Sequence, residues 1–413
     1  MKATGIVVEY NPLHNGHVYH AQQARETTQA DVVIAVMSGN FLQRGEPAFV
    51  DKWARTKMAL QSGIDIVFEL PYRFATAHAP IFARGAITLL DAVGCSSFCF
   101  GSEDGDITPF TNSLSLINQT ETVYETVVKK AIQDGRSYPN ALKEAYTSIQ
   151  DNTSQTQLAD LTKPNNILGF HYMEAAQCIG SMMKPTTIQR RGADYHEADL
   201  HAHKVASATG IRKSYFSTGT MDEMEPFVPQ ATKDILFDWQ AERGHFGNWE
   251  TFYPYLRYTI LREGPIRLAS IADITEGIEN AIYRAALKHD AFQPFMAQVK
   301  SKRYTWTRIQ RMLTHILTGF TVEQRETMPA PSYLRLLGMT GDGQTYLRSV
   351  KKHLTLPLIS KVATLSNDSL TMDIRAADLY AMALGNCQHV PKIGLDYLTP
   401  PIRTHHFGSN DSK

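Results

Sequence analysis

The stretch that decides the fold is residues 4–17, which read TGIVVEYNPLHNGH. Its first half is apolar and β-branched, which predicts a buried strand, and Asn11-Pro12 then predicts a turn. Gly16 allows backbone or a ligand to come close, and apolar residues recur at helical spacing after His17. A helix that begins here would offer free backbone amides and the positive end of its dipole to a phosphate. The stretch therefore predicts a strand, a phosphate-binding turn and a helix.

The same alternation of strand and helix continues through the first half of the chain. Further strands are expected at residues 31–37, 64–70, 96–101 and 186–190, and helices at residues 17–27, 52–62 and 80–93. This order is typical of a parallel sheet with helices on both faces. Ligands bind such sheets beyond the carboxyl ends of the strands, so the residues that follow each strand are the first candidates for a site.

The remaining segments predict the domain organisation. Residues 106–163 are polar and helical in pattern, which indicates an insertion within the first domain. Strands are expected to stop after Lys213, where amphipathic segments follow at residues 253–262, 271–287, 306–318, 346–353 and 371–384. The sequence thus predicts an α/β chain with a Rossmann-like parallel-sheet domain over residues 1–215 and a C-terminal all-helical domain over residues 216–405. Residues 406–413 are expected to be a disordered tail.

Composition excludes several classes of protein. The 413 residues are 43% hydrophobic and 20% charged, which excludes a disordered or low-complexity chain. No apolar run approaches the ~18 residues that span a bilayer, and no secretion signal opens the chain, so a cytoplasmic location without membrane contact is expected. Cys95 and Cys99 lie beside apolar residues and are expected to be buried. Residues 196–203 read HEADLHAH, whose HExxxH spacing does not match the HExxH of zinc sites, so no metal site is predicted.

His14-Asn15-Gly16-His17 has the HxGH form typical of nucleotidylyltransferases. In that chemistry the two histidines donate hydrogen bonds to the α-phosphate as it becomes pentacoordinate. The alternative is a pair of surface histidines in a turn. The position between the first strand and the first helix favours the catalytic interpretation.

A second motif follows the last expected strand of the first half. Ser207, Thr209 and Arg212 form the pattern SxTxIR at the start of an expected helix. Hydroxyls, amides and the arginine could hold the β- and γ-phosphates of a nucleotide. Alone, the motif could equally be a capped helix start with Ser207 or Thr209 as the N-cap. Together with HxGH it predicts ATP cleaved between its α- and β-phosphates.

Four stretches, residues 8–17, 37–48, 163–169 and 206–213, resemble those of bacterial tRNA(Met) cytidine acetate ligases. The resemblance implies a nucleotidylyltransferase fold and a reaction in two steps. Acetate and ATP would give acetyladenylate and pyrophosphate, and the acetyl group would pass to N4 of the wobble cytidine of elongator tRNA(Met), forming N4-acetylcytidine. Acetate, ATP and this tRNA are the implied substrates, and no protein partner is implied. The sequence does not indicate whether Mg²⁺ accompanies the ATP.

The resemblance also implies which residues contact ATP. In and beside the HxGH loop these are Val7, Val8, Glu9, Tyr10, Asn11, Pro12, Leu13, His14, Asn15, Gly16, His17 and His20. Farther along the chain they are Gly101, Asn165, Asn166, Arg190 and Arg191, together with Ser207, Thr209 and Arg212. The residues expected to take part in catalysis are His14, His17 and Arg212.

Local chemistry leaves alternatives at several of these positions. Gly101 ends a strand at the expected ligand edge, although a plain turn would also use a glycine there. Of Asn165 and Asn166, one is expected to be an N-cap and the other to face the ligand. Arg190 could pair with a phosphate or with a structural carboxylate.

The loop over residues 38–46 follows the second strand and is a candidate pocket for acetate or cytidine. Arg44 is the natural partner of a carboxylate, and Asn40 and Gln43 could read a base edge. A solvated turn is the alternative interpretation.

The helical half carries a local excess of positive charge. Residues 300–361 contain eleven basic and three acidic side chains, a net charge of +8 in a chain with 41 of each sign. Basic and aromatic residues alternate at its start, which suits phosphate contact and base stacking. The expected tRNA contacts are Lys302, Arg303, Trp306, Arg308 and Arg311. The alternative is a solvated face with Trp306 buried.

Two other functions fit the motifs. An adenylyltransferase that builds a dinucleotide cofactor from a small phosphorylated metabolite would use the same two motifs, but it would leave the basic helical half without a role. A nucleotide-binding protein that contacts RNA without catalysis is disfavoured by the intact histidines and Arg212.

Overall fold

The computed structural model describes residues 1–134, 136, 138–150, 157–190, 206–385 and 392–404. Within them, eight strands form one sheet in the order β5-β4-β1-β2-β3-β6-β7, and β8 pairs with β6. The strands are β1 (Ala3–Val8), β2 (Val32–Ser38), β3 (Ile66–Leu70), β4 (Ser97–Ser102), β5 (Lys184–Gln189), β6 (Leu334–Thr340), β7 (Leu358–Ile359) and β8 (Ile402–Thr404). Strands β1 to β5 run parallel, whereas β6 is antiparallel to β3.

All five strands expected in the first half are confirmed. So are the helices between them, which are α1 (Asn15–Thr28), α2 (Lys52–Leu60) and α4 (Ala79–Ala92). Alternate residues of β2 face opposite sides of the sheet, as the pleat requires. Val33, Ala35 and Met37 pack with the side that α1 and α2 cover. Val32, Ile34 and Val36 pack with the side that α4 covers. The sheet is thus covered on both faces, as predicted.

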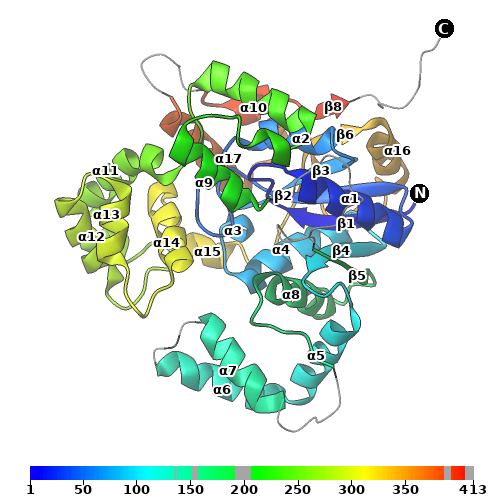
Figure 1. Cartoon of the computed structure of the whole chain (residues 1–413), viewed down its shortest axis with the longest axis horizontal. Helices are drawn as coiled ribbons and strands as arrows, with labels where there is room; N and C mark the ends of the chain where they lie inside the picture. The colour runs from blue at the N-terminus through cyan, green and yellow to red at the C-terminus, as the bar shows by residue number, and fades with distance from the viewer. Residues whose placement is uncertain (135, 137, 151–156, 191–205, 386–391, 405–413) are drawn as a thin grey trace.

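The segment over residues 106–163, here called the insertion, is mainly helical where the structure describes it, and its place as an insertion within a first domain stays a prediction. It consists of α5 (Thr108–Gln119), α6 (Glu121–Gln133) and α7 (Tyr138–Gln150), and α8 (Pro164–Cys178) then returns the chain to β5. Figure 1 shows α6 and α7 beyond α8, on the side away from α9 and α10. The insertion therefore extends the molecule on one side.

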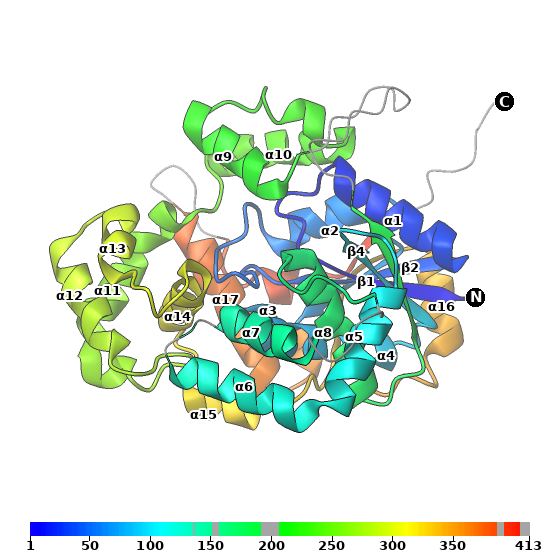
Figure 2. The same ribbon diagram turned by 60° about the horizontal axis from the view of Figure 1, so that its bottom comes forward.

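The second half is mainly helical. Its helices are α9 (Ala208–Thr218), α10 (Gln230–Arg243), α11 (Trp249–Leu268), α12 (Ile278–Lys288), α13 (Phe292–Val299), α14 (Trp306–Thr318), α15 (Val322–Thr327), α16 (Gly341–Val350), α17 (Asp368–Ala383) and α18 (Leu395–Leu398). In Figure 2 the group α11 to α13 lies to one side of the sheet, and α9 and α10 lie above it. The mixed α/β fold class with a helical C-terminal region is confirmed.

The expectation that strands stop after Lys213 is wrong. Strands β6, β7 and β8 come from the second half and extend the sheet beyond β3. All seven residues of β6 are buried. The physical reason is that β3 would otherwise be an open edge, and β6 satisfies its backbone groups. Strands β7 and β8 are short, and all three strands lie among helices, so their apolar runs do not stand out in the sequence.

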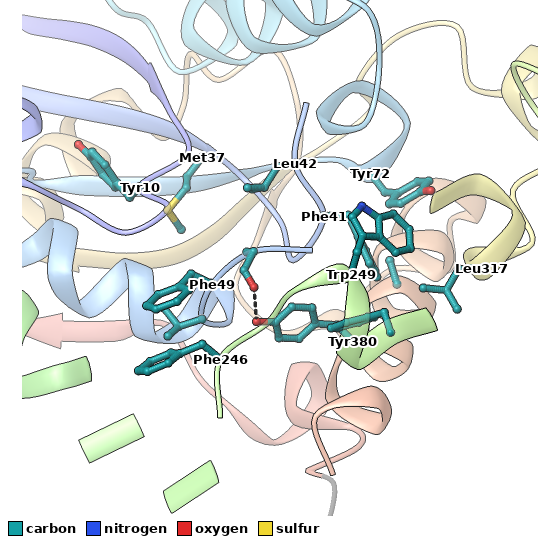
Figure 3. Packing of buried hydrophobic residues seen from close by; sticks show 14 of the residues in the cluster. Tyr10, Met37, Phe41, Leu42, Phe49, Tyr72, Phe246, Trp249, Leu317 and Tyr380 are labelled. Carbon is teal, nitrogen blue, oxygen red and sulfur yellow. Dashed lines mark hydrogen bonds between the residues drawn. The ribbon is translucent and has the colours of Figure 1, made fainter. Parts of the chain in front are cut away.

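One hydrophobic core contains residues of both halves of the chain. Residues 38–49, which follow β2, pack in this core against residues of the second half. Figure 3 shows Phe41 and Phe49 of the first half beside Phe246 and Tyr380 of the second. Phe49 stacks on Phe246 with ring centroids 4.0 Å apart, and the Tyr380 hydroxyl donates to the carbonyl of Ala48 at 2.8 Å. The domain boundary near residue 215 stays a prediction, because this core continues across it.

None of the described helices is both long enough and apolar enough to cross a membrane.

Candidate active site

The HxGH motif forms the amino end of α1. His14 is the N-cap, and its Nδ1 accepts from the backbone N–H of Gly16 at 3.1 Å. The Nδ1 of His17 accepts from the backbone N–H of His14 at 3.2 Å, which completes a reciprocal capping box. A nitrogen that accepts from an amide carries no proton, so each neutral ring holds its proton on Nε2. The backbone therefore sets both tautomers, and Nε2–H is the donor that each histidine offers.

The histidines are stacked and held neutral. The rings of His14 and His17 lie 3.7 Å apart at an interplanar angle of 25°. Burial, together with the positive charge of Arg190, lowers the pKa of His14 and of His20 to about 4. Burial and then the neighbouring His14, Arg190 and His20 lower the pKa of His17 well below its usual value. Neutral Nε2–H donors beside the cation of Arg190 are suited to receive a polyanion such as ATP.

The neutral state of His14 predicts how stability depends on pH. An unfolded chain protonates histidine near pH 6.5, whereas the folded chain holds the pKa of His14 at about 4. Between these two pH values the unfolded state binds more protons than the folded state. The contribution of His14 to the free energy of unfolding should therefore be fully present above about pH 6.5 and be lost as the pH drops toward 4. The loss from His14 alone should be roughly 3 kcal/mol.

Urea denaturation at a series of pH values measures this dependence. The control is His14→Asn, which keeps a side-chain N-cap acceptor but does not titrate. The pH dependence of this variant should be shallower by the contribution of His14. The prediction would be contradicted if the free energy of unfolding changed equally with pH in both proteins between pH 4 and 6.5.

The residues before the histidines shape the turn. Tyr10 packs its ring edgewise on His17, with centroids 5.0 Å apart. A cis peptide bond joins Asn11 to Pro12. The side-chain oxygen of Asn11 accepts from the backbone N–H of Phe49 at 2.6 Å. The turn is thus tied to the loop that follows β2.

Glu9 also connects the turn to the loop that follows β2. Its Oε1 accepts from the backbone N–H of Gln43 at 2.8 Å and from the hydroxyl of Ser38 at 3.3 Å. Burial raises the pKa of Glu9, and the hydrogen bond from Gln43 acts in the opposite direction. Of the other predicted loop contacts, Val8 and Leu13 are buried, and Val7 is half-buried. Their side chains belong to the core, so any contact with ATP there would come from the backbone.

Gly101 and Arg190 lie together where β4 and β5 end. A Cβ added to Gly101 would come within 2.9 Å of Cγ of Arg190, so the absence of a side chain lets the arginine cross this strand. The Arg190 side chain makes no hydrogen bond or ion pair with any described residue, although Glu103 lies within electrostatic range. This favours a phosphate over a structural carboxylate as its partner. The structure thus brings Arg190 close to the histidines, and the contact with ATP that the resemblance implies stays a prediction.

The two asparagines of α8 have different roles. Asn166 is fully buried, and it accepts from the backbone N–H of Glu103 at 3.1 Å and donates to the carbonyl of Asp160 at 3.2 Å. Asn165 donates to the Glu103 carboxylate at 3.0 Å and is half-buried. The expectation that one of them is an N-cap is wrong, because Lys163 holds that position without a side-chain hydrogen bond. Asn166 organises the loop after β4, which leaves Asn165 as the candidate ligand contact.

Arg212 joins the second motif to the first. Its Nη1 donates to the carbonyl of Asn11 at 2.7 Å, and its Nη2 forms an ion pair with Glu46 at 3.1 Å. Ser207 is the N-cap of α9 and accepts from the backbone N–H of Gly210 at 3.1 Å. Thr209 is exposed in the first turn. Arg212 thus orients the HxGH turn, and its contact with the β- and γ-phosphates stays a prediction.

The residues expected to form an acetate or cytidine pocket do not all face one space. The side-chain oxygen of Asn40 accepts from the backbone N–H of Lys52 at 2.7 Å, and Asn40 is buried at the start of α2. Gln43 is half-buried above Glu9, and Arg44 is exposed. Asn40 therefore supports the loop, while Gln43 and Arg44 stay candidate contacts.

The expected tRNA contacts also divide. Lys302 is exposed, and Trp306 is 37% exposed, so the alternative of a buried tryptophan is not supported. Arg303 pairs with Glu276 at 2.7 Å, and Arg308 stacks on the ring of Tyr304 at 4.9 Å. Arg311 differs from the other expected contacts in that it is largely buried. The Arg311 side chain is only 11% exposed, because α14 packs this side against the rest of the molecule.

The remaining predictions concern Arg191, the HEADLHAH segment and the cysteines. Arg191 and residues 196–203 lie outside the described residues. Cys95 and Cys99 are buried, as expected, and burial raises the pKa of the Cys99 thiol to about 11. Among the residues that the structure describes, no group of three or more His, Cys, Asp or Glu side chains is placed so that it could hold a metal ion. The sequence interpretation missed Glu46 and Glu103, the carboxylates that hold Arg212 and Asn165. The only local signal was that Glu46 belongs to the distinctive run 37–48.

A parallel sheet whose first strand leads through a capped HxGH turn into a helix, with Arg190 beside it, defines a nucleotidyl transferase fold. Consistent with this class, a family model described as HIGH Nucleotidyl Transferase matches residues 1–392. The tRNA(Met) cytidine acetate ligase of Lysinibacillus sphaericus is 53% identical over 98% of this chain and 100% of its own length. That of Bacillus subtilis strain 168 is 45% identical over 93% of each chain. The chain therefore belongs to the tRNA(Met) cytidine acetate ligase family, as the sequence resemblance indicates.

Solved structures of a related protein support the same family assignment. The crystal structure of Thermotoga maritima TmcAL bound with alpha-thio ATP superimposes with a TM-score of 0.89 and 31% identity, over 98% of this chain and 100% of that one. An apo form of the same protein gives the same values. The likeness thus extends through the helical half.

Proposed function

We propose that this protein is an ATP-dependent ligase that activates acetate as acetyladenylate and transfers the acetyl group to N4 of the wobble cytidine of elongator tRNA(Met). The observation that carries the proposal is the stacked pair His14 and His17, whose tautomers the backbone fixes with Nε2–H as the donor. Arg190 supplies a cation beside them, and its side chain forms no ion pair with a described carboxylate. Neutral donors and a cation at a helix amino end are what a phosphorus under attack requires.

In the first step, a carboxylate oxygen of acetate attacks the α-phosphorus of ATP. The new bond joins acetate to the α-phosphate, the bond between the α- and β-phosphates breaks, and pyrophosphate leaves. Negative charge grows on the non-bridging α-phosphate oxygens during the attack. The Nε2–H groups of His14 and His17 donate to these oxygens more strongly in the transition state than in the ground state, which accelerates the step.

In the second step, the N4 amine attacks the carbonyl carbon of acetyladenylate. A carbon–nitrogen bond forms, the bond from carbon to the AMP oxygen breaks, N4 loses one proton, and AMP leaves. Arg44 is exposed at the edge of the 38–46 loop and is proposed to hold the acetate carboxylate. The basic surface of the helical half, including Lys302 and Trp306, is proposed to contact tRNA.

The naming of the relatives as ligases and their match over the whole helical half support this function over an adenylyltransferase of small metabolites. Such an enzyme would not need the second half.

The direct test uses purified protein, ATP, isotopically labelled acetate and tRNA from cells that lack the gene. We expect label to enter tRNA as N4-acetylcytidine without coenzyme A, with one AMP formed for each acetyl group transferred. Mass spectrometry of the tRNA nucleosides identifies the product. Label that enters only from acetyl-coenzyme A would overturn the mechanism.

A further inference from the structure

A second cluster of charged and imidazole side chains lies between the sheet and the helical half. It gathers around one carboxylate, Asp273, in the turn between α11 and α12. We call it the Asp273 cluster, and its members are Arg73, His78, Asp273, Arg311, His315 and Arg325. Arg73 belongs to α3 (Tyr72–Ala75), and His78 immediately precedes α4. The other side chains come from α14 and α15 of the second half.

Asp273 pairs loosely with each of its neighbours. Its carboxylate oxygens lie 3.5 Å from Nη1 of Arg325, 3.8 Å from Nε2 of His315 and 3.9 Å from Nε of Arg311. Nitrogen–oxygen hydrogen bonds in proteins cluster near 2.9 to 3.0 Å, so none of these is a close ion pair. Nε of Arg311 is buried without any hydrogen-bond partner in the described structure. One carboxylate is therefore shared among several donors, and its hydrogen bond from Nη1 of Arg325 is long at 3.5 Å.

The cluster carries an excess of positive charge. Three arginines, Arg73, Arg311 and Arg325, face the single carboxylate of Asp273, and arginine stays charged in proteins. Arg73 lies close enough to Arg325 that its Nε donates to that residue's backbone carbonyl at 3.4 Å. Burying cations without matching anions costs free energy. The arrangement is therefore explained best by an anion that joins it from outside.

His315 adds a neutral donor. Burial, opposed by Asp273 and reinforced by Arg311, Arg73 and Arg325, lowers the pKa of His315 to about 4. Nδ1 of His315 is paired with the hydroxyl of Tyr72 at 2.8 Å, which leaves Nε2 directed at Asp273. A neutral ring does not add to the charge that the carboxylate has to balance, but it can donate to an anion.

The cluster is open to solvent on one side. His78 is exposed, Arg73 is half-buried, and the Arg325 side chain is 35% exposed. It also lies on the edge of the sheet where the candidate active site is, because α3 follows the carboxyl end of β3. The backbone of Arg311 packs directly on Gly45 in the loop that follows β2. In Figure 1, α3, α14 and α15 lie between the sheet and the group α11 to α13.

We propose that the Asp273 cluster binds backbone phosphate of the tRNA, with Arg73 and Arg325 as its accessible contacts. The inference rests on the proposed function and extends the tRNA contact beyond the exposed residues Lys302 and Trp306. Guanidinium groups match the geometry of a phosphodiester and bind it without reading its base. ATP already has a site at the histidines of α1, and acetate is a single small anion, so three converging arginines fit a polyanion better.

The test measures tRNA affinity against salt concentration for Arg73→Gln and Arg325→Gln. Each phosphate contact contributes roughly 0.7 to 0.9 units to the slope of log affinity against log salt. Each variant should therefore lose about this much slope and bind tRNA about five- to eightfold more weakly at about 0.1 M salt. The matched control is Arg267→Gln, because Arg267 is 77% exposed and also pairs with a carboxylate, Glu263, but lies outside the cluster. Its affinity and slope should equal those of the unchanged protein.

The variant Asp273→Asn distinguishes two roles for the cluster, an anion-binding site and an ion-pair network that only stabilises the fold. Asp273 has φ +65°, a left-handed conformation that asparagine adopts readily, so this variant is expected to fold. Removal of the competing carboxylate should tighten tRNA binding by a similar factor and steepen the salt slope. Weaker binding in Asp273→Asn, or unchanged binding in both arginine variants, would overturn the proposal.

Two further measurements distinguish other causes. Acetyladenylate formation without tRNA should be unchanged in Arg73→Gln and Arg325→Gln, so failure of the proposed chemistry and failure of this site are distinguishable. If inorganic pyrophosphate raises the melting temperature of the unchanged protein but not of Arg325→Gln, while tRNA affinity is equal in both, the site takes a small phosphate. The assignment to tRNA would then be wrong.

Discussion

His17→Ala is expected to lower the rate of acetyladenylate formation about 100- to 1000-fold. The ring of His17 stacks on His14 at 3.7 Å, and its Nδ1 is occupied by the backbone N–H of His14. Only Nε2–H is left to donate to the α-phosphate as charge develops. Removal of one such donor costs about 2.7 to 4 kcal/mol of transition-state stabilisation. The capping box would also be lost, which adds disorder to the turn.

The measurement is single-turnover formation of acetyladenylate from ATP and acetate, with no tRNA present. The matched control is His353→Ala, which removes an exposed imidazole beyond the end of α16 and should leave the rate unchanged. Affinity for tRNA should be the same in both variants, because the loss is chemical. A rate for His17→Ala within a few-fold of the unchanged protein would remove His17 from the mechanism.

Gly45→Ala is expected to cause a large loss of stability, about 2 to 5 kcal/mol in the free energy of unfolding. Gly45 has φ +71°, and a Cβ there would lie 2.2 Å from the backbone nitrogen of Arg311. Neither the loop nor α14 can yield easily. The Gly45 carbonyl accepts from the indole of Trp249 at 3.2 Å and from the hydroxyl of Thr314 at 3.0 Å. A methyl group would therefore force the 38–46 loop away from the helical half.

Gly219→Ala supplies the matched control. Gly219 has φ +74°, but nothing lies within 4 Å of its Cβ position. It should lose only the cost of a left-handed alanine, about 1 to 2 kcal/mol. Urea denaturation gives the free energy of unfolding of both variants. Gly219→Ala reports the backbone strain alone, and Gly45→Ala reports the same strain together with the steric clash against α14. Equal losses would show that the contact between Gly45 and α14 yields without cost.

Local patterns in the sequence predict the nucleotide-binding half well. The period-two runs of β1 to β5 and the helical spacing between them appear within windows of about ten residues. The HxGH turn is also local, because His14 and His17 cap the helix that they open and need no distant partner. Its chemistry could therefore be inferred before any contact was known.

The parts that were mispredicted depend on partners far away in the chain. Strand β6 forms because β3, more than 260 residues earlier, offers it an unpaired edge. Asn166 is structural because Glu103 and Asp160 take both ends of its amide. Arg311 is at helical spacing from Arg308, yet packing of α14 buries it. Propensity and periodicity describe a residue's neighbours along the chain and carry no information on these pairings.

The sequence by itself thus determined the class of fold, the order of the first strands and helices, and the residues of the phosphate-binding turn. Only the tertiary structure decided which side chains stay available for a ligand. Arg190 is available because no described carboxylate pairs with it, and Arg212 is engaged with Asn11 and Glu46. The Asp273 cluster exists only because α3, α14 and α15 meet. Availability depends on burial and pairing across the whole molecule, which folding alone establishes.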